Sequence, residues 1–560
     1  MKIPALVVSL FLLFSSAFAV LEIPNAQPKI GAEQWKQVLD STWQGLKRRN
    51  IDAYSSKSNG LVHRPKSETP GDAVSEGVSY GMLLALYADD QEYFDKIFKA
   101  AITHRFRACE DWRKRFDGGW CENCGGSASD ADEDIAAALV FAAKLLEKNK
   151  WRNTGVSYSD EARKAVNCVR GQLSGDGNDP RDGALKPGNG WGWEVYNPGY
   201  FAPAWFRVFK TFDTENAATW EQAAKRSYEL IKMNPGFSNG LVPDWMDGEG
   251  RVLNGGPGYN AYLKGQEFFK DAIRMLWRVA TDVIWFPNEH PENSTGKTYL
   301  KNAMAFIKSK GGPSAANFYR LNGELLPEGD KWLEFNDEKN SNTWRWRREH
   351  SHLTVGQWAQ VAMAVGTDQD KIAWSSEMAK FYDWENKKDF FGLEVDTITG
   401  SGVEDTLHNE MYFDQFLAWF GVSLMSGTWM NVVDVLNNPV STNKEGLPDL
   451  PWPPPPPPSS SSSDPSSSSE PQPSSSSQQT EAIVKLHQFE KIGVQISQTG
   501  NALHLISQSD ANWKIYNLQG KLMFSSKSKE AVWNMGNFKG VAVVSIKQNS
   551  KTEQKLIMLR

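Results

Sequence analysis

The chain has 560 residues, which leaves room for several domains of ordinary size or for one large barrel with smaller parts. Hydrophobic residues make up 40% and charged residues 23%, so the composition excludes a membrane-embedded or a fully disordered protein. The formal net charge of −6 argues against a nucleic-acid-binding protein. Of the 23 tryptophans, 20 lie between Trp35 and Trp429; most should pack in a core, and a few in loops could stack against flat ligands.

Residues 1–19 are typical of a secretory signal peptide. Lys2 precedes a mostly apolar run over residues 3–14, and the small residues Ala17 and Ala19 form a cleavage site. No later stretch has about 18 uninterrupted apolar residues, so no membrane-spanning helix is predicted. We therefore expect cleavage near Ala19 and a secreted or cell-surface protein.

Residues 20–450 are predicted to form one large, mostly helical domain. Hydrophobic periodicity indicates about twelve helices, at residues 33–47, 77–88, 91–105, 132–149, 159–172, 199–212, 217–233, 271–283, 297–309, 353–365, 369–381 and 411–426. Twelve helices joined as antiparallel neighbours can close into a double ring, with six inside and six outside. A solenoid is the alternative, but the chain shows no fixed repeat period.

Polar clusters fall at the start of every second predicted helix. They contain Glu76, Asp130 with Asp132, Asn197 with Tyr200, Asp271, His350 with His352, and Asn409 with Tyr412. In an up-and-down ring these helices all begin at the same end, so the clusters should converge on one rim. Helix capping is the simpler explanation for Asp130 or Asn197, but it does not account for Glu76 or for the neighbouring aromatic residues.

A proline- and serine-rich stretch, residues 451–480, predicts an extended spacer between this domain and the C-terminal 80 residues. Residues 481–560 change character, with 11 Lys and Arg against 5 Asp and Glu. Short alternating strands in this tail predict a small β-sandwich.

The four cysteines are Cys109, Cys121, Cys124 and Cys168, and they allow three disulfide pairings. Cys121 and Cys124 have the spacing of a zinc or redox motif, but zinc needs two further ligands and no second motif of this kind exists. A disulfide is the favoured interpretation in an exported protein, and the pairing stays open.

Two carboxyls have the surroundings that acid–base chemistry needs. Glu76 stands between small residues at the start of an apolar helix, where burial would raise its pKa and suit a general acid. Asp271 stands at a predicted helix N-terminus near Arg274, and both favour an ionised carboxylate that can act as a base. Glycosidic bond cleavage uses such a pair.

Metal binding is the alternative interpretation of two clusters. The run from Asp130 to Asp134 fails the calcium-loop pattern, since Ile135 and Phe141 stand where glycine and glutamate are required. His350 and His352 lack a third ligand and are more simply structural. We therefore expect no metal and no cofactor.

With these motifs the chain resembles glycoside hydrolase family 8, the old cellulase family D. The matching segments are Ser75–Met82, Gly126–Ala142, Leu185–Gly192, Asn197–Trp205, Gly240–Trp245 and Asp271–Arg278. The resemblance covers roughly residues 25–440. It implies an all-α (α/α)6 barrel, which agrees with the helix count, and hydrolysis with inversion at the anomeric carbon.

The resemblance also implies roles for individual residues. Glu76 would be the general acid, Asp271 the general base that activates water, and Asp130 a residue that holds the distorted sugar and the water. In an inverting enzyme the acid and base carboxyls lie roughly 6.5–9.5 Å apart.

Further residues are assigned by the resemblance to substrate binding: Trp112 and Trp191 for sugar stacking, and Arg274, Tyr412 and Tyr200 around the cleavage point. Two positions depart from the family pattern. Lys270 and Gly190 stand where an aromatic residue and an arginine are often found, which leaves the preference for glucan or xylan open.

The sequence thus predicts a secreted inverting endo-β-1,4-glucanase that acts on cellulose, cellodextrins or mixed-linkage β-glucan. A xylanase of the same family is one alternative; a non-catalytic polysaccharide-binding surface protein is another, but it would be expected to lack the acid or the base. We expect a monomer without nucleic-acid partners.

The tail resembles the C-terminal sorting domains of type IX secretion cargo, on segments Ile515–Leu522, Gly540–Lys547 and Lys555–Leu559. Contact with secretion machinery or with the cell surface would follow. A carbohydrate-binding module is the alternative, but the tail offers few aromatic residues.

Overall fold

The computed structural model consists of two compact units, Met1–Ser459 and Ser460–Arg560. The described residues are 20–64, 72–116, 124–175, 182–253, 267–289, 291–325, 334–337, 342–345, 350–384, 388–392, 395–400, 403–408, 412–438, 449–450, 484–489, 494–499, 502–517, 522–534, 540–548 and 551–559. The predicted signal peptide, residues 1–19, and the predicted spacer, residues 451–480, lie outside them.

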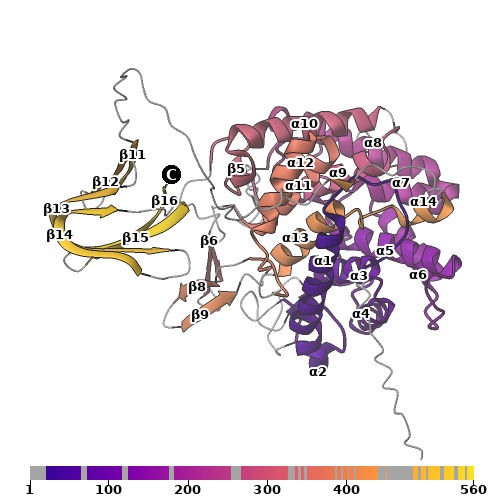
Figure 1. Cartoon of the computed structure of the whole chain (residues 1–560). Coiled ribbons are helices and arrows are strands. Elements are labelled where there is room, and N and C mark those ends of the chain that lie inside the picture. Colours follow the sequence, from indigo (N-terminus) through magenta and orange to yellow (C-terminus); the bar gives the residue numbers. More distant parts are fainter. Residues whose placement is uncertain are drawn as a thin grey trace, which may run out of the picture. The chain divides into compact units, whose positions relative to one another are not determined.

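The first unit is a double ring of helices (Figure 1). The inner ring consists of α3 (Ser75–Tyr87), α5 (Ser129–Glu147), α7 (Pro203–Phe212), α9 (Arg274–Trp285), α11 (His352–Val365) and α13 (Tyr412–Met425). Each of these helices contacts the next in this order, and α13 contacts α3, which closes the ring.

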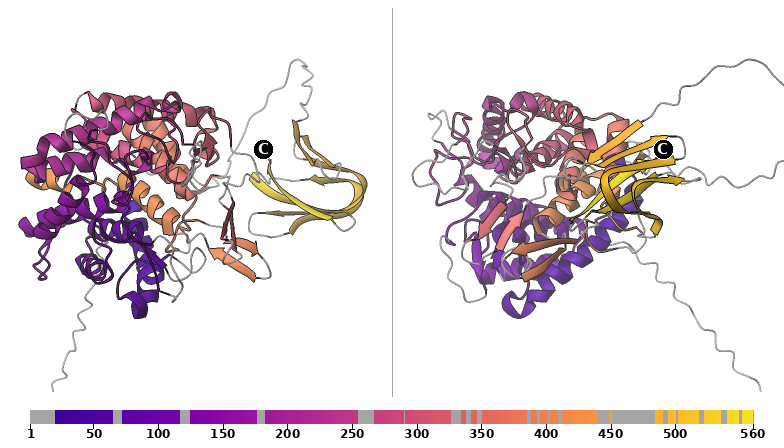
Figure 2. Two further views of the ribbon diagram at one scale, coloured as in Figure 1. Left: turned by 180° about the vertical axis from the view of Figure 1, so that it is seen from behind. Right: turned by 90° about the vertical axis from the view of Figure 1, so that its left-hand side faces the viewer.

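The outer ring consists of α1 (Ala32–Leu46), α4 (Gln91–His104), α6 (Tyr158–Arg170), α8 (Ala217–Met233), α10 (Glu292–Ser309) and α12 (Asp368–Ala379). Each outer helix packs on an inner neighbour, with α4 on α3, α6 on α5, α8 on α7, α10 on α9, α12 on α11 and α1 on α13. Figure 2 shows the helices of this unit from two further sides. This arrangement fits the predicted (α/α)6 barrel, and all twelve predicted helices are present.

The composition of the helices explains which ring they join. In α3 every residue except Glu76 is buried, because the helix is almost entirely apolar and is covered on all sides. In α6 only one stripe is buried, and its charged residues face solvent. The inner helix α3 is thus a continuous apolar run, whereas the outer helix α6 is amphipathic.

Most helix starts differ from the prediction by one to five residues: α10 begins at Glu292 and not at residue 297, and α3 begins at Ser75, so that Glu76 lies within its first turn. The helix expected from residue 132 begins at Ser129, so Asp130 and Asp132 lie within its first turn and not before it. The helix expected from residue 199 begins at Pro203, a residue suited to the first turn of a helix, and a 3-10 turn over Pro198–Tyr200 precedes it. The helix expected from residue 271 begins at Arg274, which leaves Asp271 on the preceding turn.

Short elements decorate the ring. The helical ones are η1 (Lys47–Ile51), η2 (Asp52–Tyr54), α2 (Ser55–Ser58), η3 (Pro198–Tyr200), η4 (Thr214–Asn216), η5 (Phe237–Asn239), η7 (Gly312–Ser314) and α14 (Val432–Asn437). The paired strands are β1 (Lys29–Ile30) with β10 (Asp449–Leu450), β2 (Asp72–Val74) with β3 (Arg113–Arg115), β4 (Glu267–Phe268) with β5 (Tyr319–Arg320), β6 (Glu334–Asp337) with β7 (Asn342–Arg345), and β8 (Val395–Gly400) with β9 (Val403–His408). Only β1 and β10 are parallel among these pairs.

Most described tryptophans pack in the core, as predicted. Trp205, Trp285 and Trp429 form an aromatic cluster with ring centroids 5.4–6.1 Å apart.

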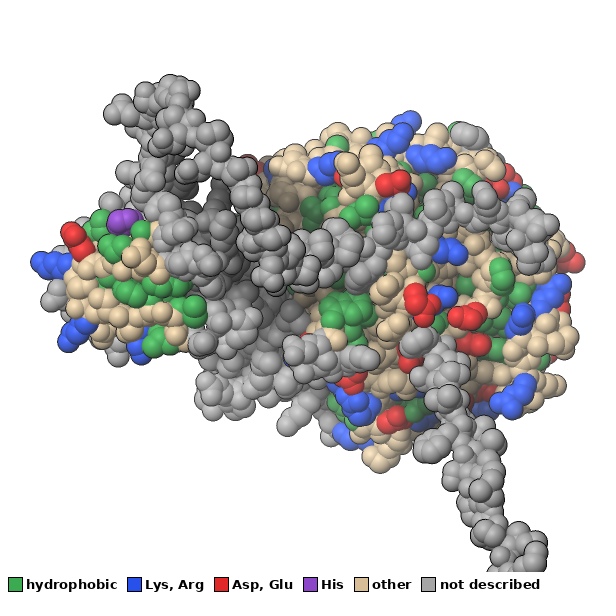
Figure 3. All heavy atoms as spheres, viewed as in Figure 1, with side chains coloured by type: hydrophobic (Ala, Val, Ile, Leu, Met, Phe, Trp, Pro, Cys, Tyr) green, Lys and Arg blue, Asp and Glu red, His purple; other side chains and the backbone are tan. Residues whose placement is uncertain are grey.

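No described helix is long and apolar enough to span a membrane. On the face shown in Figure 3, acidic and basic side chains are interspersed over the described surface of this unit.

The second unit is an antiparallel six-stranded sheet. Its strands are β11 (Val484–Phe489), β12 (Val494–Thr499), β13 (Ala502–Asn517), β14 (Leu522–Asn534), β15 (Gly540–Gln548) and β16 (Lys551–Leu559). They are ordered β11-β12-β13-β15-β16, and β14 pairs with β13. Because β13 pairs with β12 through its first half and with β15 through its second half, the strands form one hydrogen-bonded network. The β-sandwich stays a prediction.

The structure selects one disulfide from the pairings that the sequence left open. Cys109 is bonded to Cys168 in α6, across 59 residues of chain. Cys124 is also disulfide-bonded, and Cys121 lies outside the described residues.

Candidate active site

The N-terminal ends of the inner helices bring three carboxylates onto one guanidinium. Arg274, in the first turn of α9, is fully buried. Its Nη1 donates to Glu76 Oε2 at 2.6 Å and to Asp130 Oδ2 at 2.6 Å, and its Nη2 donates to Asp271 Oδ1 at 3.1 Å. Five of the six predicted clusters therefore converge on this rim, because Tyr412 contacts Glu76, and Asn197 and Tyr200 contact Asp271 and Arg274.

Glu76 lies in the first turn of α3 and keeps a partly open position, with 17% of its side chain exposed. The hydroxyl of Tyr412 donates to its second oxygen, Oε1. Burial raises the pKa of Glu76, the nearby Asp130 adds to this rise, and the Arg274 guanidinium opposes it.

Asp130 is buried in the first turn of α5. It does not cap that helix; its Oδ2 accepts from Arg274, and its Oδ1 has no hydrogen-bond partner among the described residues. Burial raises the pKa of Asp130, with Arg274 acting in the opposite direction. The capping explanation therefore fails for this residue.

Asp271 is the most open of the three carboxylates, with 27% of its side chain exposed. Asn197 Nδ2 donates to its Oδ2 at 3.1 Å, while Asn197 Oδ1 accepts from the backbone of Gly199 at 3.0 Å. Gly199 has to be a glycine here, because a Cβ would stand 2.1 Å from the carbonyl oxygen of Asp271. Asn197 thus caps a turn, as the sequence suggested, and also orients Asp271.

The separation of Glu76 and Asp271 is bounded by the guanidinium that both contact. The terminal nitrogens of this planar group are about 2.3 Å apart, so the bonded oxygens lie at most about 8 Å apart. Tyr200 covers the same group, with the Arg274 guanidinium carbon 4.9 Å from its ring centroid.

A second ion pair lies one helical turn further along the same two helices. Arg278 donates to both oxygens of Asp134, at 2.5 and 3.0 Å, and Trp205 Nε1 donates to Asp134 Oδ1 at 2.6 Å. Sequence reasoning missed this pair. The signal was available, since Asp134 and Arg278 follow Asp130 and Arg274 by four residues each, which places them on the same helix faces.

The predicted sugar-stacking residues lie beside this site on separate loops. Trp191 stacks on Trp245 with ring centroids 5.4 Å apart and an interplanar angle of 23°, and Tyr200 meets Trp245 edge-on at 6.1 Å. Trp112 is half-buried, and its backbone carbonyl accepts from Ser75 N, next to Glu76, at 2.8 Å. Trp245 is the aromatic residue that sequence reasoning did not single out.

The histidine pair has local structural contacts. His350 Nε2 lies 3.0 Å from Glu377 Oε1, and His352 Nε2 lies 3.2 Å from Gln415 Nε2. Lys270, which departs from the family pattern, places its ammonium 4.7 Å from the Phe413 ring centroid. Asn409 lies outside the described residues.

Among the described residues one trio of potential metal ligands comes together, Cys109, Asp132 and Cys168. Both sulfurs of this trio belong to the disulfide, so the trio does not offer thiolate ligands. The carboxylates on Arg274 are already paired with a cation.

The family model for glycosyl hydrolases family 8 matches residues 32–317. The chain belongs to this family. Endoglucanase 2 of Ruminiclostridium josui is 35% identical over 293 residues, which cover 52% of this chain and 58% of that protein. Endoglucanase A of Acetivibrio thermocellus is 33% identical over 296 residues, which cover 52% of this chain and 57% of that protein. The chain thus spans less than two thirds of the length of these curated relatives.

A solved structure of Rex8A from Paenibacillus barcinonensis, complexed with xylose, has a TM-score of 0.52 and 19% identity, and the match covers 71% of this chain and 93% of that one. The apo structure of a β-1,3-1,4-glucanase from Paenibacillus sp. X4 has a TM-score of 0.52 and 18% identity, covering 73% and 97%. At this identity the two structures show a shared fold for the helical unit.

Proposed function

We propose that this family 8 protein is a secreted, inverting endo-β-1,4-glucanase. The observation that carries the proposal is the buried Arg274 guanidinium, which gathers Glu76, Asp130 and Asp271 at the rim of the inner ring. Glycosidic cleavage requires two carboxyls in different environments, and Glu76 and Asp271 differ in exposure and in hydrogen-bond partners.

The proposed chemistry follows from these surroundings. Glu76, whose pKa is raised by burial, keeps its proton to higher pH and gives it to the leaving glycosidic oxygen. Asp271 accepts hydrogen bonds from Arg274 and Asn197, which orient its carboxylate, and takes a proton from the attacking water. Water attacks the face opposite the leaving group, so the configuration at the anomeric carbon inverts.

One further feature supports this assignment, and another is compatible with it. The bonded oxygens of Glu76 and Asp271 lie at most about 8 Å apart, which reaches the lower part of the inverting range of roughly 6.5–9.5 Å and also includes the roughly 5–5.5 Å of retaining enzymes. Asp130 has one buried oxygen without a described partner, and this oxygen is suited to accept from a sugar hydroxyl or from the attacking water.

Xylan hydrolysis is the second candidate. A reducing end xylose-releasing exo-oligoxylanase of Halalkalibacterium halodurans is 27% identical over 273 residues, while the endoglucanases named above are 33–35% identical. The higher identity favours glucan as the substrate class, and the preference is open to a direct assay.

The test is a panel of carboxymethylcellulose, barley β-glucan, xylan and chitosan, assayed with wild type, Glu76→Gln, Asp271→Asn and the control Glu221→Gln, whose side chain is exposed. We expect cleavage of the two glucans, loss of activity in the first two variants with oligosaccharide binding retained, and wild-type activity in the control. Near-native turnover in Glu76→Gln or Asp271→Asn would remove the role assignment. If xylan is the preferred substrate, the protein is a xylanase and the glucanase assignment is wrong.

For residues 481–560 we propose sorting or anchoring at the cell surface by a type IX route. Trp513 is fully buried, donating to Ser528 O at 2.9 Å, and Trp533 is also buried, so neither offers the exposed platform of a carbohydrate-binding module. A chain ending at residue 480 should keep its activity on soluble glucan but fail to reach the outside of its native cell. Loss of cellulose binding by the truncated chain would instead indicate a binding module.

A further inference from the structure

The segment over residues 105–115, called here the Trp112 segment, connects the starts of two inner helices. Its end is β3, which pairs with β2 in the register Val74 with Arg113, and β2 leads directly into α3 and Glu76. The carbonyl of Trp112 accepts from Ser75 N at 2.8 Å, and the amide of Trp112 donates to Gly126 O at 2.7 Å. The backbone position of Glu76 therefore depends on where this segment lies.

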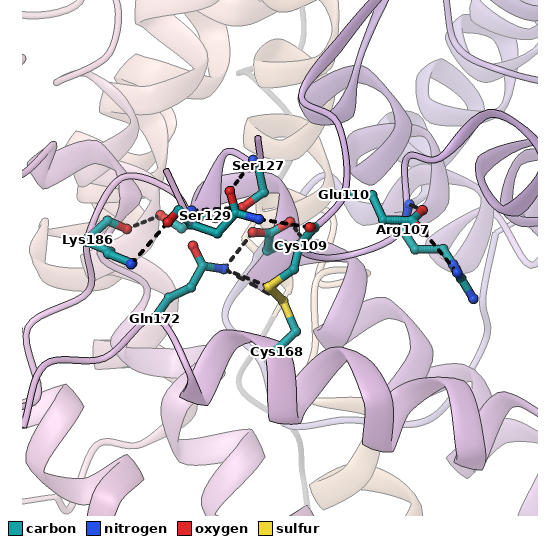
Figure 4. The surroundings of a disulfide bond; sticks show 10 residues. Arg107, Cys109, Glu110, Ser127, Ser129, Cys168, Gln172 and Lys186 are labelled. Carbon is teal, nitrogen blue, oxygen red and sulfur yellow. Dashed lines mark hydrogen bonds and ion pairs between the residues drawn. A yellow bond between two sulfur atoms is a disulfide. The ribbon is translucent and has the colours of Figure 1, made fainter. Parts of the chain in front are cut away.

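Cys109 is the point at which the segment is tied to the rest of the ring (Figure 4). Its φ of 63° is left-handed, a conformation that a residue with a Cβ rarely adopts unless its surroundings hold it there. Its amide donates to Asp132 Oδ1 at 2.8 Å, its carbonyl accepts from Asn189 Nδ2 at 2.9 Å, and its sulfur is bonded to Cys168 in α6.

Asp132 is the partner that links this point to the candidate active site. It is fully buried and lies two residues after Asp130 in the first turn of α5. Its Oδ2 accepts from Gln172 Nε2 at 2.6 Å, and this amide also faces the sulfurs of Cys109 and Cys168, at 3.4 and 3.7 Å. None of the proposed catalytic steps uses this carboxyl.

We propose that Asp132 and the Cys109–Cys168 disulfide form a positioning unit that holds the Trp112 segment, and with it Glu76, in place relative to Asp130. The effect of this unit on catalysis rests on the proposed function, whereas its effect on the position of the Trp112 segment does not. Asp132 acts here through the backbone of Cys109 and touches no reacting atom. It is a positioning residue for both the acid and the Trp112 ring.

The structural test is hydrogen–deuterium exchange, which needs no activity. Asp132→Asn and the double variant Cys109→Ser/Cys168→Ser are compared with the control Asp95→Asn. Asp95 is a buried carboxylate of the outer helix α4 that accepts from Tyr158 of α6. We expect peptides covering residues 105–116 and 72–77 to exchange at least about tenfold faster than wild type in Asp132→Asn and in Cys109→Ser/Cys168→Ser, and at the wild-type rate in Asp95→Asn. Unchanged exchange in both peptides would overturn the proposal. Serine variants are used because a reductant would also open the Cys124 disulfide.

The functional test is a double-mutant cycle with Trp112→Ala. Asp132→Asn alone should lower kcat/KM on cello-oligosaccharides by about 10–100-fold, as a misplaced catalytic group does. In the Trp112→Ala background, Asp132→Asn should raise KM by less than about twofold, because the ring that Asp132→Asn displaces is no longer present. Losses that multiply independently would contradict positioning of the Trp112 ring. If the panel shows no glycosidase activity, the proposed function fails while the exchange result still decides the positioning unit.

Discussion

Replacing Tyr412 with phenylalanine removes the hydroxyl that donates to Glu76 and leaves the ring in place. That bond favours the ionised form of Glu76, so its loss raises the pKa of this carboxyl further. A hydrogen bond to a charged group contributes about 1.5–3 kcal/mol, and one pKa unit corresponds to about 1.4 kcal/mol. Because Arg274 remains and Glu76 is partly exposed, we expect a rise at the low end, about one unit.

The assay is the pH profile of kcat/KM on a soluble cello-oligosaccharide, which reports the free enzyme. A general acid is active while protonated, so the alkaline limb of the profile should move upward by about one pH unit in Tyr412→Phe. Tyr228→Phe is the matched control, because it removes a buried hydroxyl that donates to Asp282 Oδ2 at 2.6 Å on the outer side of the ring. A limb that stays in place or moves to lower pH in Tyr412→Phe would refute the assignment of Glu76 as the acid.

Three more predictions follow from the same contacts. Arg274→Lys keeps the charge but replaces the two terminal nitrogens of the planar guanidinium by a single one, so kcat should fall by at least about 100-fold. The buried Arg207→Lys should leave kcat unchanged, and steady-state kinetics compare the two variants. Trp245→Ala removes the ring on which Trp191 stacks, so KM for long oligosaccharides should rise about 3–10-fold with little change in kcat. An unchanged KM would show that Trp191 binds no sugar. Burial raises the pKa of Asp132 to about 7 from an ordinary value of 3.8, so this carboxyl binds a proton more tightly in the folded chain. The stability gained from this proton binding, at most about 4 kcal/mol, is therefore complete below about pH 4 and is lost as the pH rises to about 7. In denaturant titrations, the free energy of unfolding of Asp132→Asn should decline less over that pH range than the free energy of unfolding of wild type does.

The helical ring could be predicted from the sequence because its signals are local. Apolar periodicity located all twelve helices, and the alternation of inner and outer helices followed from their order along the chain. The clusters at Glu76, Asp130 and Asp271 could then be assigned to one rim, since antiparallel neighbours start at opposite ends. These steps need only the helical period and the count of helices.

The contacts between distant residues could not be predicted in the same way. The three-way contact of Arg274 joins residues separated by up to 198 positions, and the bond from Tyr412 to Glu76 spans 336. Such pairs depend on how the ring closes, on helix tilt and on side-chain rotamers, and none of these features produces a periodic pattern in the sequence. The pairing of Cys109 with Cys168 could not be predicted for the same reason, because the positions of the four cysteines in the sequence are compatible with all three pairings.

The central claim is that Glu76 and Asp271 cleave a β-glucosidic bond with a water molecule between them. Proton NMR of cellopentaose hydrolysis, recorded in the first minutes before mutarotation, tests this claim most directly. We predict that the new reducing ends form first as the α-anomer and only later equilibrate with the β-anomer. Initial formation of the β-anomer would show retention and would contradict the assigned roles of both carboxyls.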